Sequence, residues 1–113
     1  MRRITAMGVA ALLAFAGTAR SQDSYPNRPI HIVVPSAAGG TTDIVARAVA
    51  QALTQALGVS VIVEQRVGGN TNIGTASVAR ATPDGYTLLV NTDTLTSNAS
   101  VYRDPGYDPV ASF

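Results

Sequence analysis

Glycine, hydroxyl and amide residues gather in three short segments, each of which follows an apolar run. The segments are Pro35-Ser36-Ala37-Ala38-Gly39-Gly40-Thr41-Thr42-Asp43, Gly68-Gly69-Asn70-Thr71-Asn72-Ile73-Gly74 and Asn91-Thr92-Asp93-Thr94. A glycine-rich turn between a strand and a helix leaves backbone N–H groups free, and the helix dipole adds partial positive charge to them. The first two segments therefore predict a site for a small ligand that carries a carboxylate or a phosphate.

The elements that must position these segments follow from the spacing of apolar residues. Residues 30–34, 59–64 and 86–90 are apolar runs of strand length, typical of buried strands in a parallel sheet. Helical spacing predicts helices over about residues 42–57, 73–81 and 95–102. Gly58 suits the left-handed position after the first helix, and Thr71 or Asn72 suits the capping position of the second.

This order of elements predicts an α/β fold, β-α-β-α-β followed by a short helix, with a parallel sheet and helices on both faces. The three strand-to-helix turns then lie at one edge of the sheet, where the strands have their carboxyl ends. Open α/β sheets bind their ligands at that edge. A purely conformational role for the glycines, and a role in turn geometry for the neighbouring Asn and Thr residues, stay open as alternatives.

The sequence lacks the motifs of an enzyme. The first turn has no G-x-G-x-x-G pattern, there is no phosphate-binding P-loop, and the chain contains no lysine. Ser36 lies outside a G-x-S-x-G elbow, and His31, within a strand, has neither a cysteine nor a second histidine as a co-ligand. We expect no catalysis, cofactor or metal. His31 is expected to be a packed or edge-of-sheet histidine, and Asp43 to have a local role at the start of its helix.

The first 21 residues have the layout of a secretory signal peptide. Arg2 and Arg3 precede an alanine-rich apolar stretch that is short for a bilayer span, and small residues follow it. A buried N-terminal helix is the alternative. The remaining chain has five arginines, seven acidic residues and no cysteine, which gives no electrostatic footprint for nucleic acid. We expect a periplasmic monomer that has no membrane anchor and binds no nucleic acid.

Six blocks of the mature chain keep a common order and spacing with a known family. They are Tyr25-Pro26-x-x-Pro29-Ile30, Val34-Pro35-x-Ala37-Ala38-Gly39-Gly40-x-Thr42-Asp43, Val63-Glu64-x-Arg66-x-Gly68, Asn72-Ile73-Gly74-Thr75, Pro83-Asp84-Gly85-Tyr86-Thr87-Leu88-Leu89 and Tyr107-Asp108-Pro109-Val110-x-x-Phe113. Together they resemble the Bug-type (TctC-like) substrate-binding receptors of tripartite tricarboxylate transporters. The resemblance covers the mature chain from end to end.

The resemblance implies a periplasmic receptor with two α/β lobes that close around a small organic carboxylate. Such receptors deliver the ligand to the membrane permease subunits of the transporter and have no catalytic function. Carried over by position, the implied ligand-binding residues are Ser36, Ala37, Ala38, Gly39, Gly40, Thr41, Thr42, Asp43, Gly69, Asn70, Thr71, Asn72, Thr92, Thr94 and Thr96.

Several positions depart from the family pattern. Ser36 replaces a usual aromatic residue, Val67 replaces proline, and Leu95 and Ala99 replace histidine and proline, so the identity of the carboxylate is not implied. Such receptors are roughly three times longer, which makes residues 22–113 an incomplete first lobe by expectation. A truncated remnant, a small exported interaction module, or an exported hydrolase whose catalytic residues lie elsewhere are the alternatives.

Overall fold

The computed structural model describes residues 24–113, so the expected signal peptide over residues 1–21 lies outside the described residues. Six elements alternate along the chain. They are β1 (Ile30–Val34), α1 (Thr41–Leu57), β2 (Val61–Gln65), α2 (Asn72–Ala79), β3 (Thr87–Leu89) and α3 (Thr94–Val101). The predicted order and type of all six elements are confirmed. Within residues 24–113, no helix combines the length and the apolar character needed to cross a membrane.

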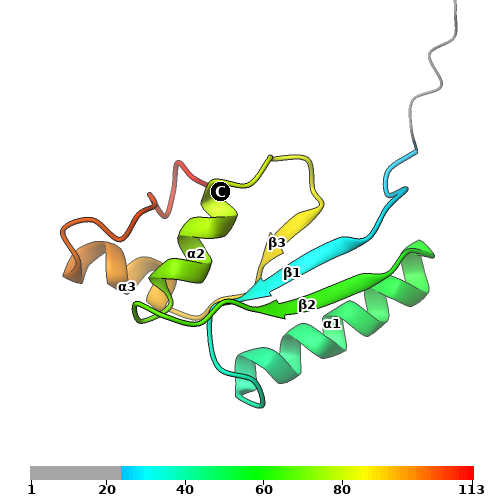
Figure 1. Ribbon diagram of the computed structural model, residues 1–113, viewed down its shortest axis with the longest axis horizontal. Coiled ribbons are helices and arrows are strands. Elements are labelled where there is room, and N and C mark those ends of the chain that lie inside the picture. Colours follow the sequence, from blue (N-terminus) through cyan, green and yellow to red (C-terminus); the bar gives the residue numbers. More distant parts are fainter. Residues whose placement is uncertain (1–23) are drawn as a thin grey trace, which may run out of the picture.

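The three strands form one parallel sheet in the order β2-β1-β3, which makes β1 the central strand. Ile30 is in register with Val61, and His31 is in register with both Ile62 and Thr87. α1 packs on one face against β1 and β2, and α2 packs on the other face against β1 and β3 (Figure 1). The predicted α/β class, with helices on both faces, is confirmed.

The core forms on both faces of β1. Ile32 and Val34 pack with Ala46 and Ala50 of α1. Val33, whose side chain points to the opposite face, is fully buried as well. Because both faces of the central strand are covered, its sequence is a continuous apolar run rather than an alternating one.

His31 is the polar exception in β1, and its side chain is 40% exposed. Its Nδ1 lies 2.6 Å from Oε1 of Glu64 on β2. The hydrogen bond from His31, followed by one from Arg66, holds the pKa of the Glu64 carboxyl below its usual value. The histidine thus joins two strands.

The ends of the elements differ in detail from the prediction. α1 ends at Gly58 with φ 70°, and its N–H donates to the Thr54 carbonyl over 3.1 Å, as expected. β2 begins at Val61 because its ladder starts opposite Ile30. Thr71 does precede α2, but its side chain makes no capping hydrogen bond to the helix. The capping prediction is therefore correct in position and wrong in mechanism.

Candidate ligand-binding site

The three polar segments meet at the carboxyl edge of the sheet. Backbone hydrogen bonds from Arg66 N–H to the Val34 carbonyl (2.9 Å) and from Val90 N–H to the Val33 carbonyl (3.0 Å) keep the three strand ends level. Because the strands are parallel, each helix then begins at the same edge (Figure 1). We name the loops that follow β1, β2 and β3 the first, second and third turn.

The first turn presents backbone donors. Its residues from Ala37 to Thr41 are exposed. α1 has no side-chain cap, and the N–H of Ile44 donates to the Gly40 carbonyl over 3.0 Å. The preceding N–H groups, those of Thr41, Thr42 and Asp43, have no acceptor within the helix. Such donors at a helix start suit an anion.

Asp43 fixes the shape of the first turn. Its side chain is buried, with Oδ2 accepting from Gly39 N–H (2.9 Å) and Arg47 Nε (3.1 Å) and Oδ1 accepting from Gln65 Nε2 (2.6 Å). The Gly39 hydrogen bond, then the one from Arg47, holds the pKa of this carboxyl below its usual value. Both carboxylate oxygens are thus engaged within the protein, which agrees with the local role expected for Asp43 and also occupies the Gly39 N–H.

Gly74 brings the second turn against the first. A Cβ at this position would lie 2.5 Å from the Arg66 carbonyl oxygen and 2.8 Å from the Pro35 Cβ. A real side chain therefore does not fit between the first turn of α2 and the ends of β1 and β2. The absence of a side chain at Gly74 sets how closely the start of α2 approaches the first turn.

A ring of hydrogen bonds joins the second turn to the third. Thr71 Oγ1 donates to Thr94 Oγ1 over 3.0 Å, and Thr94 Oγ1 donates to Asn91 Oδ1 over 2.9 Å. Asn91 Nδ2 donates to Thr75 Oγ1 over 3.0 Å, and Thr75 Oγ1 donates to the Thr71 carbonyl over 2.8 Å, which closes the ring. The structure thus places two residues predicted for the site, Thr71 and Thr94, in direct contact.

Asn98 is a member of the site that the sequence analysis missed. It lies on α3 and is 3% exposed. Its Nδ2 donates to the Asn70 carbonyl (2.6 Å) and to Asn72 Oδ1 (2.8 Å), and its Oδ1 accepts from Asn70 Nδ2 (3.2 Å). The one signal available was an asparagine within a helix of small residues, where a buried amide requires partners.

The other predicted residues have more peripheral positions. Thr92 Oγ1 lies 3.3 Å from Thr94 Oγ1 and is exposed. Gly69 is exposed, and its carbonyl accepts from Asn72 N–H. The hydroxyl of Thr96 donates to the Asp93 carbonyl of its own helix start, outside the ring. Ser36 Oγ is buried and has no hydrogen-bond partner among the described residues.

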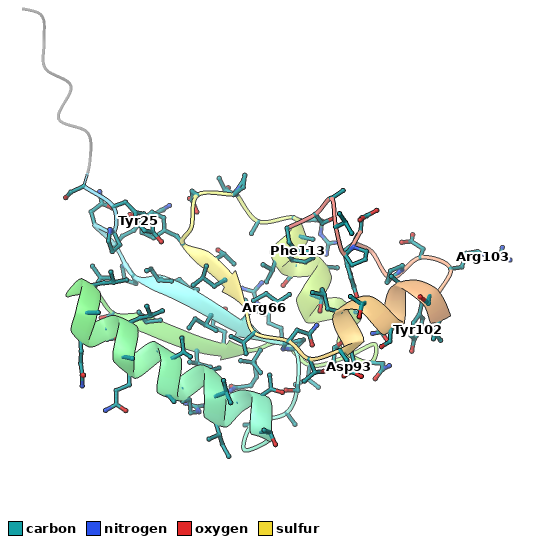
Figure 2. All side chains as sticks on the ribbon, turned by 180° about the vertical axis from the view of Figure 1, so that it is seen from behind. Tyr25, Arg66, Asp93, Tyr102, Arg103 and Phe113 are labelled. Carbon is teal, nitrogen blue, oxygen red and sulfur yellow. The ribbon has the colours of Figure 1, made fainter. Side chains whose placement is uncertain are left out.

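The cationic side chain in the three turns, Arg66, is already paired within the protein. Arg66, at the start of the second turn, donates to Glu64 Oε2 and to Ser77 Oγ, each over 2.9 Å. Arg66 and Asp93 mark the second and the third turn in Figure 2. Over residues 24–113, no three His, Cys, Asp or Glu side chains cluster closely enough to hold a metal ion. The three turns can therefore bind a ligand by hydrogen bonds from N–H, hydroxyl and amide groups.

Comparisons with known proteins connect this chain to a receptor family. A sequence profile described as "Tripartite tricarboxylate transporter family receptor" matches residues 45–113. A UPF0065 protein of Agrobacterium vitis is 45% identical over 95 residues, which cover 84% of this chain and 28% of that protein. The protein BugT of Bordetella pertussis is 43% identical over 93 residues, covering 80% of this chain and 28% of BugT.

Solved structures of the same kind share the fold. The periplasmic binding protein BugD superposes with a TM-score of 0.76 at 48% identity, covering 79% of this chain and 30% of BugD. Malate-bound MatC of Rhodopseudomonas palustris superposes with a TM-score of 0.74 at 33% identity, covering 79% of this chain and 31% of MatC. An adipate-bound protein of R. palustris superposes with a TM-score of 0.72 at 41% identity, covering 75% of this chain and 29% of that protein.

This chain spans less than a third of the length of each of these relatives. The fold shared with BugD over 79% of this chain and the profile match over residues 45–113 point to one conclusion. The chain belongs to the tripartite tricarboxylate transporter family of receptors.

Proposed function

We propose that this chain forms the carboxylate-binding edge of an extracytoplasmic solute receptor, which captures a small organic acid for the permease of a tripartite tricarboxylate transporter. The observation that carries the proposal is the meeting of three helix starts and their polar turns at one edge of the sheet. Relatives of the same fold are bound to malate and to adipate. Export through residues 1–21, and the absence of catalysis, are parts of the same proposal.

The chemistry of the edge supports a carboxylate. A carboxylate accepts several hydrogen bonds at once, and the first turn supplies N–H groups at a helix start. The Thr71 and Thr94 hydroxyls donate within the ring and join the second turn to the third. Because Arg66, the cation in the described turns, is already paired with Glu64, the affinity should depend only weakly on ionic strength. A site built on an arginine would lose affinity as salt screens its charge.

The test is thermal stabilisation of the longest product of the native gene, purified from its host. Malate, adipate and other mono-, di- and tricarboxylates are compared with their uncharged amides at the same concentration. A ligand at one hundred times its Kd adds about 2.7 kcal/mol of stability. We expect at least one acid to raise the Tm while its amide does not. If none of the acids shifts the Tm, the proposal is wrong.

A pair of threonine variants locates the site. Thr71→Val removes a hydroxyl in the ring at the carboxyl edge and keeps the shape of the side chain. Thr82→Val makes the same change at an exposed position in the loop before β3, at the opposite edge. We expect Thr71→Val to weaken acid binding at least fivefold and Thr82→Val to leave it unchanged. Equal effects would place the ligand elsewhere.

A further inference from the structure

The second turn has a backbone conformation that its residues do not favour. Asn70 has φ 51° and Thr71 has φ 74°. Asparagine tolerates the left-handed region, but a β-branched residue such as threonine is rarely found there. Conformations of this kind persist when the surroundings hold them in place, and they concentrate at functional sites. Some contact must therefore hold this turn.

Asn98 supplies that contact from a different element. Its buried amide donates to the Asn70 carbonyl within the strained pair and to Oδ1 of Asn72 just after it, while it accepts from Asn70 Nδ2. A third, longer approach joins its Nδ2 to Thr71 Oγ1 at 3.4 Å. One side chain on α3 thus contacts three consecutive residues of the second turn. Water does not compete for these bonds, because Asn98 is 3% exposed.

We propose that Asn98 is a positioning residue that holds the second turn in its ligand-binding shape. The inference rests on the proposed function for its effect on ligand, but its effect on the turn is independent of any ligand. Asn98 does not itself need to touch the acid. It acts by keeping Asn70 and Thr71 in their left-handed backbone conformation.

The matched control is a change at Tyr107, whose hydroxyl also binds α3. Tyr107 OH donates to the Leu95 and Thr94 carbonyls over 2.9 and 3.3 Å, so its hydroxyl is hydrogen-bonded to α3 and not to residues 70–72. Tyr107→Phe removes this hydroxyl and keeps the ring. Asn98→Leu removes the amide, keeps a similar volume and adds no charge that would repel an acid. Asn98→Ser serves the same purpose if the leucine variant does not fold.

The first readout is amide hydrogen exchange in the ligand-free protein purified as the longest product of the native gene. Asn72 N–H and Thr75 N–H donate to the carbonyls of Gly69 and Thr71, so their exchange reports on the second turn. Ile44 N–H in α1 serves as the internal standard. We expect Asn98→Leu to speed exchange of the two reporters at least tenfold more than exchange of Ile44 N–H. We expect Tyr107→Phe to change both reporters by less than threefold.

The second readout is the Kd for malate or adipate, whichever binds the unaltered protein. We expect a loss of at least tenfold for Asn98→Leu and less than threefold for Tyr107→Phe. Unchanged exchange in the Asn98 variants, or faster exchange with unchanged affinity, would overturn the proposed role. If neither acid binds the unaltered protein while exchange still rises, control of the turn is supported and the ligand assignment is the part that fails.

Discussion

Gly74 is the residue at which the second turn meets the first, and it lets two opposing effects be compared. Replacing glycine by alanine within a helix normally raises the free energy of unfolding by about 1 kcal/mol. Here the added Cβ would meet backbone on both sides, at 2.5 Å from the Arg66 oxygen and 3.0 Å from the Pro35 Cα. Backbone atoms move less easily than a flexible side chain, so the steric clash should outweigh the gain in helix propensity. We expect Gly74→Ala to lower the free energy of unfolding by about 1–3 kcal/mol.

Chemical denaturation measures this effect, with Gly40→Ala as the control. At Gly40 the nearest atom to a new Cβ is 3.5 Å away, which is ordinary contact, and φ is −76°. Gly40→Ala should lower the free energy of unfolding by at most about 1 kcal/mol, which is the difference between glycine and alanine at the N-cap of a helix. Equal losses for the two variants would show that close approach is not what position 74 requires.

Asp43 makes stability depend on acid pH. Its pKa is lowered in the folded protein from an ordinary value of 3.8, chiefly by the Gly39 N–H and by Arg47. A carboxyl with a lowered pKa contributes stability that is present above the unfolded value. That contribution is lost as the pH falls through 3.8 towards the folded pKa. The Tm of the unaltered protein should therefore fall more steeply below about pH 4 than that of Asp43→Asn. Parallel curves would mean that the ionised carboxylate has no net role.

At the scale of elements, the end of α1 provides a separate prediction. Gly58 has φ 70°, nothing lies within 4 Å of a Cβ built there, and its N–H closes the helix on Thr54. Gly58→Ala should therefore lower the free energy of unfolding by about 1 kcal/mol, because alanine disfavours a positive φ. Gly58→Asn should cost less, because asparagine tolerates positive φ. Denaturation midpoints of the two variants would test this order, and a more stable alanine variant would contradict it.

Some features of the elements could be predicted because they depend on local sequence. The β-branched run of β1 and the glycine after α1 act within a few residues of themselves, and parallel pairing then forces the three turns to one edge. The partners of Asn98 could not be predicted, because they depend on how α3 docks on α2. Thr71 shows the same limit, since its hydroxyl bonds to Thr94 on another element and does not cap α2.

At the scale of the whole molecule, the described residues leave two apolar surfaces exposed. One is the outer face of α1, where Ile44, Val45 and Val49 are 63%, 49% and 41% exposed. The other is a hollow beside β3, lined by Leu89, Leu95 and Phe113 among others. Phe113 and α2 lie together on that side in Figure 2. Contiguous exposed apolar surfaces of this kind mark interaction sites or promote aggregation.

These surfaces predict the behaviour of a polypeptide limited to residues 22–113. A chain of this size buries a limited share of its surface, so its free energy of unfolding should be at most about 5 kcal/mol. It should bind a dye that reports exposed apolar surface, such as ANS. Its proposed acid-binding edge would contact a ligand from one side only. We therefore expect its affinity for malate or adipate to be at least tenfold weaker than that of a full-length relative such as MatC for malate.

Calorimetry on the two proteins side by side measures this difference, with the amide of the same acid as the ligand control. Weak but measurable binding by residues 22–113, abolished by Thr71→Val, would locate part of the binding free energy in the three turns. The preorganised first and second turns would then supply orientation, and the remaining affinity would come from enclosure of the ligand. Affinity equal to that of the relative would contradict this division, because one open edge would then suffice to hold the acid.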